Sequence, residues 1–234
     1  MYLHPRSPPS YGSGLALTAP QIEPTTFRTW LRILSRLPNA ILWLLRFPDL
    51  GETHLRQTAV AWAGEEVASR ILFTDVAPKA QHISRARVCD LFLDTPECNA
   101  HTTAADVLWS GTPLLTLPRY GYKMCSRMAA SILKGALPRS EEGRRAAGEL
   151  IVASEDEYEE VAVRLAKGCT YNGYRIKGRL GELRRVLYEA RWSSALFDTR
   201  RWVRDLEGAY WIAWKRWVGG VGGDIWLEKE LKGR

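Results

Sequence analysis

The chain has 234 residues, of which 46% are hydrophobic and 25% charged, and its formal net charge is +7. This length suffices for one large domain or one lobe of a two-lobed enzyme, and the composition excludes a chain that is disordered throughout. The longest apolar run, 40–45, is far shorter than the roughly 20 residues of a membrane-spanning helix, and residues 1–20 lack a signal-peptide layout. We therefore expect a cytoplasmic or nuclear protein with no membrane partner.

The first 20 residues are rich in Pro, Ser and Gly and show no hydrophobic period, so we expect a disordered N-terminal segment at 1–20. Helical and strand patterns then alternate with short connections. Strands are expected at 40–47, 70–74, 88–94, 113–117 and 150–153, and helices at 25–38, 52–63, 78–87, 103–110 and 126–133. This alternation predicts an α/β fold with a parallel, Rossmann-like sheet covered by helices.

The second half of the chain predicts mainly helices. The polar stretch 135–148 is expected to be a surface loop, and the capping-box pattern at 154–157 begins a helix that runs to about Lys167. One basic helix is expected at 175–191. Another begins at Thr199 and ends at Gly219, with a flexible tail after it, and its apolar positions share one face: Val203, Leu206, Tyr210, Ala213 and Trp217.

The positive charge is concentrated at the C-terminal end. Residues 170–234 carry 14 Lys and Arg against 8 Asp and Glu, which accounts for +6 of the +7. Such a surface attracts nucleic acid or acidic partners. A solvated face of amphipathic helices explains the same charge, and we favour it over a nucleic-acid partner.

The cysteines and histidines show neither a disulfide pattern nor a metal-binding pattern. The four cysteines have no C-x-x-C spacing, and the four histidines form no paired ligand motif. We expect reduced thiols, no metal site and no cofactor. The four cysteines are Cys89, Cys98, Cys125 and Cys169.

Two polar clusters follow two of the predicted strands. After 88–94 come His101, Thr102 and Thr103, at the start of a helix that also carries Asp106. Free N–H groups and hydroxyls at a helix start can hold a phosphate, although Thr-x-x-Asp is also an ordinary capping pattern. There is neither a P-loop nor a dinucleotide-binding glycine motif. The phosphate hypothesis and the capping hypothesis both stay open on this pattern.

The other cluster follows the strand 70–74. Lys79, His82 and Arg85 recur at a spacing of three, so they fall near one face of a helix, and Ala77 precedes them. In a nucleotide site, the Lys and Arg side chains would neutralise phosphate and the neutral imidazole would stack on a planar base. An ordinary basic surface helix shows the same spacing, so both interpretations stay open. Ligands of open parallel sheets bind at the carboxyl ends of the strands, so we expect the two clusters to share one pocket on adjacent strand ends.

Several segments resemble the protein O-GlcNAc transferase family in their amino-acid sequence and in their order along the chain. The similarity runs from about Gln21 to Val218 and is carried by 37–48, 70–79, 93–103, 106–113, 126–131 and 192–198. It implies a GT-B fold of two Rossmann-like lobes that binds UDP-GlcNAc mainly in the C-terminal lobe. The chain would be the C-terminal part of that lobe, with residues 21–218 as its incomplete catalytic lobe and a helical extension.

The resemblance also implies roles for individual residues. Ala77, through its backbone, and Arg85 would contact the uracil, with His82 stacked nearby. Lys79 and Asp106 would bind the ribose. The diphosphate would lie on the start of the helix, against His101, Thr102 and Thr103. The family transfers GlcNAc from UDP-GlcNAc to Ser or Thr hydroxyls of proteins, with inversion and without a metal.

Several family features are expected to be missing. These are the tetratricopeptide repeats, the N-terminal catalytic lobe and the first strands of the C-terminal lobe. A family lysine before an Ile-Asp-Pro motif aligns with Gln21, which carries no charge, and no catalytic base can be assigned. Three hypotheses stay open: a transferase that depends on absent segments, an inactive UDP-sugar-binding remnant, and a basic interaction module at 175–215.

Overall fold

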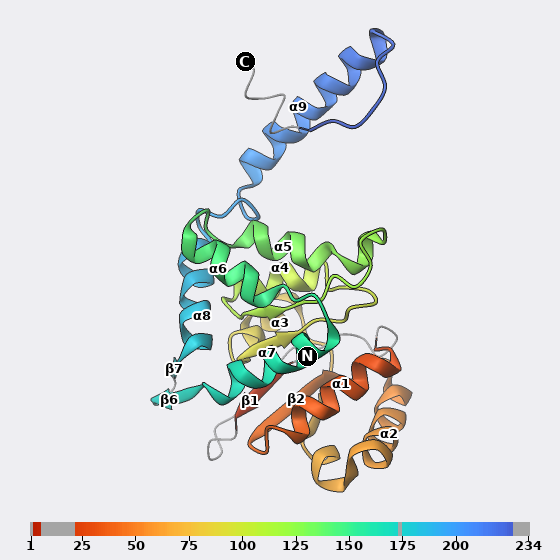
Figure 1. The fold of residues 1–234 in the computed structure, drawn as a ribbon, viewed down its shortest axis with the longest axis vertical. Helices are drawn as coiled ribbons and strands as arrows, with labels where there is room; N and C mark the ends of the chain where they lie inside the picture. The colour runs from red at the N-terminus through yellow and green to blue at the C-terminus, as the bar shows by residue number, and fades with distance from the viewer. Residues whose placement is uncertain (1, 6–21, 173–174, 227–234) are drawn as a thin grey trace.

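The computed structural model describes residues 2–5, 22–172 and 175–226 (Figure 1). Its elements, in chain order, are β1 (Tyr2–Pro5), α1 (Pro24–Ser35), β2 (Ala40–Leu45), α2 (Asp49–Ala68), β3 (Ile71–Thr74), α3 (Lys79–Ala86), β4 (Leu91–Leu93), α4 (Thr102–Trp109), β5 (Leu114–Leu115), the 3₁₀ turn η2 (Met124–Ser126), α5 (Met128–Ala136), α6 (Glu141–Leu150), α7 (Glu155–Lys167), β6 (Thr170–Asn172), β7 (Arg175–Lys177), α8 (Arg179–Ala190) and α9 (Thr199–Val218).

The main sheet has five strands in the order β3-β2-β1-β4-β5. β2 pairs with β3 in parallel, and β4 pairs with β5 in parallel. The expected strand at 150–153 is reduced to one parallel bridge, between Thr116 and Ile151. The α/β fold and the helix–strand alternation are therefore confirmed, because the buried apolar runs form strands and helices connect them.

One central strand was not expected. β1 lies between β2 and β4 and pairs with both in the antiparallel sense. The prediction of disorder is therefore wrong for Tyr2–Pro5, and the prediction of a purely parallel sheet is wrong at this strand. The backbone edges of β2 and β4 supply hydrogen-bond partners for β1 on both sides, and the composition of residues 1–20 gives no indication of this pairing. Residues 1 and 6–20 of the predicted disordered segment lie outside the described residues.

The core on the α1 side is closed by two long side chains. Trp30 of α1 is fully buried and its indole N–H donates to the hydroxyl of Tyr158 on α7, 3.4 Å away. The guanidinium of Arg70 is 2% exposed, and it donates to the carbonyls of Leu34, Leu37 and Ala40 at 2.9–3.1 Å. These bonds satisfy backbone acceptors where α1 turns into β2, and so they fix the entry to the sheet.

Two local predictions for the second half are wrong. The stretch 135–148 contains most of α6 instead of a loop, because Ser140 caps the helix and its narrow apolar stripe, with Ala146 and Leu150, is buried. The stretch 175–191 begins with β7, the second strand of the β6–β7 hairpin, and α8 follows.

The capping box is confirmed: the Ser154 hydroxyl accepts from the Glu157 N–H at 3.1 Å, and α7 follows. α9 stands clear of the body at one end of the molecule (Figure 1). Its expected start and end are also confirmed, since Asp198 caps it and Gly219 follows it. Within the described ranges, no helix combines the length and apolar character needed to cross a bilayer.

Candidate functional site

The two predicted clusters meet through helices α3 and α4. β3 and β4, which precede these helices, are not neighbours in the sheet, because β2 and β1 lie between them. The expectation of adjacent strand ends is therefore wrong. α3 carries the chain back across β2 and β1. Ser110 directly follows α4, and its hydroxyl donates to the carbonyl of Ile83 in α3 at 2.7 Å. The crossover helix, and not strand adjacency, builds the shared site.

Asp106 joins the two clusters. Its carboxylate lies 3.1 Å from the ammonium of Lys79 and 3.6 Å from Nε2 of His82. Burial lowers the pKa of His82; the nearby Asp106 opposes this shift, and Lys79 and Arg85 add to it. A lowered pKa favours the neutral imidazole at pH 7, the form that stacks on a base. Lys79 is 70% exposed, so its ammonium can turn from Asp106 toward a ligand.

The start of α4 carries the predicted phosphate-binding residues. His101 is the N-cap and no side chain caps the helix, so the expected capping by Thr102 or Thr103 is wrong. The first helical bond runs from the Ala105 N–H to the His101 carbonyl, at 3.3 Å. The N–H groups of the turn before it are thus placed to bind an external acceptor. Among the described residues, Nε2 of His101 is buried and has no partner.

Ala77 and Arg85 lie at the beginning and end of the α3 segment. Ala77 is half-buried in the loop between β3 and α3. Arg85 donates from Nη1 to the carbonyl of Asp75 at 3.0 Å, so it braces that loop. Its Nε is buried without a partner in the described part of the chain. The structure therefore places both residues around one loop, on the α3 side of the site.

A buried carboxylate that was not predicted as functional holds the loop before α4. Asp94, at the end of β4, is fully buried and accepts from the Ala100 N–H and from the Thr116 hydroxyl, each at 2.7 Å. Tyr158 donates its hydroxyl to the Asp94 carbonyl at 2.8 Å. Burial raises the pKa of Asp94 to about 7, although both hydrogen bonds oppose the shift. Only the polarity of Asp94 amid an apolar strand marked it in the sequence.

Arg119, in the loop after β5, contacts three acidic side chains. It lies 2.7 Å from Glu23 and 3.6 Å from Glu97, and it donates from Nε to Glu155 at 3.0 Å. The chain segment before α1 is thus held beside the loop that follows β5. Gln21, the position of the missing family lysine, lies outside the described residues.

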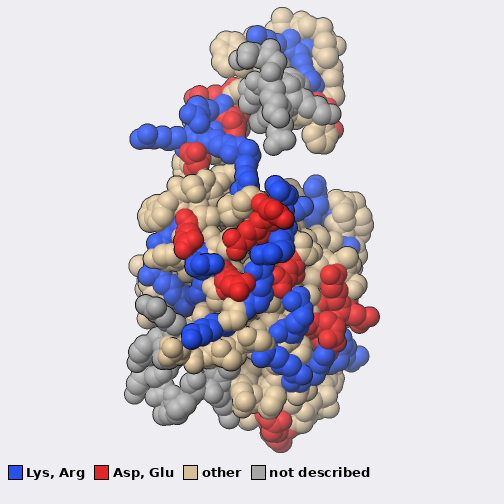
Figure 2. All heavy atoms as spheres, turned by 60° about the vertical axis from the view of Figure 1, so that its left-hand side comes forward, with Lys and Arg blue, Asp and Glu red and all other residues tan. Residues whose placement is uncertain are grey.

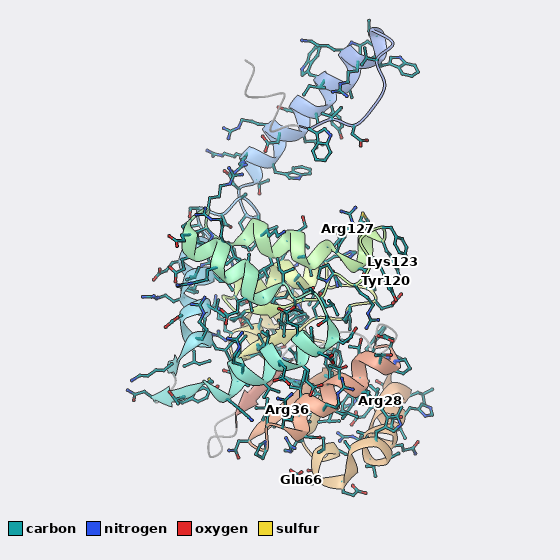
Figure 3. All side chains as sticks on the ribbon, in the orientation of Figure 1. Arg28, Arg36, Glu66, Tyr120, Lys123 and Arg127 are labelled. Carbon is teal, nitrogen blue, oxygen red and sulfur yellow. The ribbon has the colours of Figure 1, made fainter. Side chains whose placement is uncertain are left out.

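A cavity in the described part of the chain lies away from the α3–α4 site. A cavity of about 260 Å³ is bordered by Arg36, Ala40, Asp90, Lys167 and Cys169. Ala40 begins β2, and Arg36 follows the end of α1 (Figure 3). The cavity is therefore at the amino ends of the strands, opposite the α3–α4 site, which is open to solvent.

The basic residues of α8 do not form a free cationic surface. Arg179 lies 2.7 Å from Glu149, and Arg184 donates to the carbonyl of Arg87 at 2.9 Å. Arg191, just after α8, is 8% exposed and lies over the ring of Tyr188, 3.7 Å from its centroid. Figure 2 shows Lys and Arg interspersed with Asp and Glu over this face of the body. These contacts hold Arg179, Arg184 and Arg191 against the body, which argues against a nucleic-acid surface at α8.

The comparisons place the chain among glycosyltransferases. Glycosyl transferase family 41 matches residues 19–206. A probable UDP-N-acetylglucosamine–peptide N-acetylglucosaminyltransferase, SEC, of Arabidopsis thaliana is 42% identical over 86% of this chain and 18% of its own length. A UDP-N-acetylglucosamine–peptide N-acetylglucosaminyltransferase of Caenorhabditis elegans is 38% identical over 86% of this chain and 16% of its own. The chain thus spans less than a fifth of these relatives.

A solved structure gives the same picture of the fold. A mutant of the O-GlcNAc transferase from Thermobaculum terrenum matches with a TM-score of 0.67 at 24% identity, covering 86% of this chain and 36% of that one. The fold is that of part of the C-terminal lobe of a GT-B enzyme. More narrowly, the chain belongs to glycosyl transferase family 41.

Proposed function

We propose that this chain provides the UDP-binding half of the active site of a transferase that moves GlcNAc from UDP-GlcNAc to Ser or Thr hydroxyls of proteins. The names of the relatives support the donor and the protein acceptor. The observation that carries the proposal is the approach of Lys79 and His82 to Asp106, beside the uncapped start of α4. Basic, aromatic and N–H groups for a nucleoside diphosphate then converge on one edge.

In this proposal the diphosphate lies on the N–H groups at the start of α4, near Thr102 and Thr103, with His101 Nε2 as a further polar contact. Lys79 and Asp106 bind the ribose. His82 stacks on the uracil, while Arg85 and the backbone of Ala77 contact its edge.

The same groups favour departure of UDP. As the glycosidic bond breaks, negative charge grows on the diphosphate, and fixed N–H groups together with the positive end of α4 stabilise it. We propose that this replaces a metal, so that transfer is metal-independent, and that the transfer proceeds with inversion. The acceptor hydroxyl proton is assigned to no residue of this chain.

The decisive measurement is titration of the chain with UDP by calorimetry. Lys79→Ala is expected to weaken UDP binding about tenfold, the equivalent of about 1.4 kcal/mol, because a charge-assisted contact is lost. Lys134→Ala, an exposed lysine on α5, is the matched control and should bind as the unsubstituted chain does. GDP should bind more weakly than UDP. Equal affinity of the Lys79→Ala and unsubstituted chains would contradict the proposal.

The alternative is an inactive UDP-sugar-binding remnant. Turnover separates the two. Transfer of radiolabelled GlcNAc from UDP-GlcNAc to a Ser/Thr peptide by this chain alone would reject the remnant hypothesis. UDP binding without transfer would support it.

A further inference from the structure

Two cysteines from distant parts of the sequence lie side by side, next to the loop that leads into α4. Cys98 is in that loop, and Cys125 is in η2. The Asn99 N–H donates to the Cys125 carbonyl at 2.7 Å, and the Cys125 thiol lies 3.8 Å from the Glu97 carbonyl. The two segments are therefore joined by one backbone bond after Cys98 and by one thiol contact before it.

Further contacts hold the same two segments together. The Ser126 hydroxyl donates to the Pro96 carbonyl at 2.6 Å, and the Lys123 ammonium forms an ion pair with the Glu97 carboxylate. Lys123 also lies over the ring of Tyr120, and Figure 3 shows both beside Arg127 on the loop before α5. The approach of Cys98 and Cys125 is thus held by several independent bonds, and not by one flexible loop.

The thiols themselves are neighbours. After burial, the Cys125 thiol is the next cause of the raised pKa of Cys98, through its charge and a hydrogen bond. Both cysteines are partly exposed, unlike the buried Cys89. A disulfide needs Cα atoms about 4.4–6.8 Å apart, and the bonds between the two segments keep Cys125 close to Cys98.

We propose that Cys98 and Cys125 are an oxidative modification site, at which a low-molecular-weight disulfide such as oxidised glutathione converts the two thiols into an intramolecular disulfide. One thiolate attacks the small disulfide, forms a mixed disulfide and releases one glutathione thiol. The second protein thiolate then attacks that mixed disulfide and releases the other. The two protein thiols lose two electrons and two protons, and one glutathione disulfide becomes two thiols.

The consequence is a covalent tie between η2 and the loop before α4. Asn99 and Ala100 connect Cys98 to the N-cap His101, and both are already hydrogen-bonded at this point. The disulfide closes the chain from residue 98 to residue 125, which restricts the unfolded state and stabilises the folded one. The site does not depend on the proposed sugar donor, because its formation needs only these two thiols.

The test is peptide mapping of the full chain after incubation with oxidised glutathione and alkylation of free thiols. Trypsin separates residues 88–119 from 124–127, so a disulfide appears as these two peptides joined. Cys98→Ser and Cys125→Ser should each abolish the joined species, and the first also distinguishes Cys98 from Cys89 on the same peptide. Cys169→Ser, a partly exposed cysteine elsewhere, is the control and should keep it.

A second readout is the melting temperature, which should rise by about 5 °C or more on oxidation and return on reduction with dithiothreitol. The rise should be absent in Cys125→Ser. If the unsubstituted chain carries glutathione or free thiols at both positions, with no joined peptides, the proposal is rejected. That outcome is independent of UDP binding, so it leaves the proposed function to its own test.

Discussion

The Thr116 hydroxyl donates a hydrogen bond to the Asp94 carboxylate, 2.7 Å away, where β5 and β4 end side by side in the interior. Because Asp94 also accepts from Ala100, one buried carboxyl connects two strand ends to the loop that precedes the start of α4. The position of the predicted phosphate-binding residues is thus set by Asp94, which precedes them in the sequence and lies at the end of β4.

We predict that Asp94 makes stability depend on pH between about 4 and 7. Burial raises the pKa of Asp94 from 3.8 in the unfolded chain to about 7. Below pH 4 the carboxyl is protonated in both states and its contribution is fully present. As pH rises toward 7, only the unfolded chain releases the proton, and stability falls by up to about 4 kcal/mol.

Asp94→Asn keeps the shape of the side chain and removes its titration. Urea unfolding at pH 5 and pH 8 should show a clearly smaller loss of stability for this variant than for the unsubstituted chain. Asp156→Asn, at an exposed position in the first turn of α7, serves as control and should keep the full loss. Identical losses in all three chains would show that Asp94 is not the group responsible.

Two glycines of α6 should respond oppositely to alanine. A Cβ on Gly143 would lie 2.0 Å from the Pro138 carbonyl oxygen, whereas a Cβ on Gly148 would meet nothing within 4 Å. Gly143→Ala should therefore cost about 2 kcal/mol or more, since backbone must move. Gly148→Ala should stabilise by up to about 1 kcal/mol through helix propensity. Thermal melts of both variants check this, and a stable Gly143→Ala variant would contradict the packing.

The exposed tryptophans of α9 should cause self-association of the chain. Trp211, Trp214 and Trp217 are 61%, 60% and 80% exposed, so one helix presents an aromatic surface to solvent. The double variant Trp214→Gln/Trp217→Gln should shift the chain toward monomer in light scattering after gel filtration. Tyr122→Gln removes an equally exposed aromatic outside α9 and should leave the association unchanged. A monomeric unsubstituted chain would contradict the prediction.

Several elements could be predicted because residues within the element itself, or next to its ends, determine where it forms. The apolar run at 40–45 forms β2, Ser154 and Glu157 form the predicted cap, and Gly219 ends α9. Two elements could not. α6 buries only a narrow stripe, so its polar composition predicts a loop, and the β6–β7 hairpin was masked by the basic residues around it.

The candidate site divides in the same way. The sequence by itself determined which residues are candidates for nucleotide binding, because Lys79, His82 and Asp106 are recognisable from residue type, spacing and family resemblance. Only the tertiary structure decided how they meet. The crossover of α3 past two intervening strands brings Lys79 to Asp106, and the burial of Asp94 sets the loop before α4. Both depend on contacts between residues far apart in the chain, which no local pattern encodes.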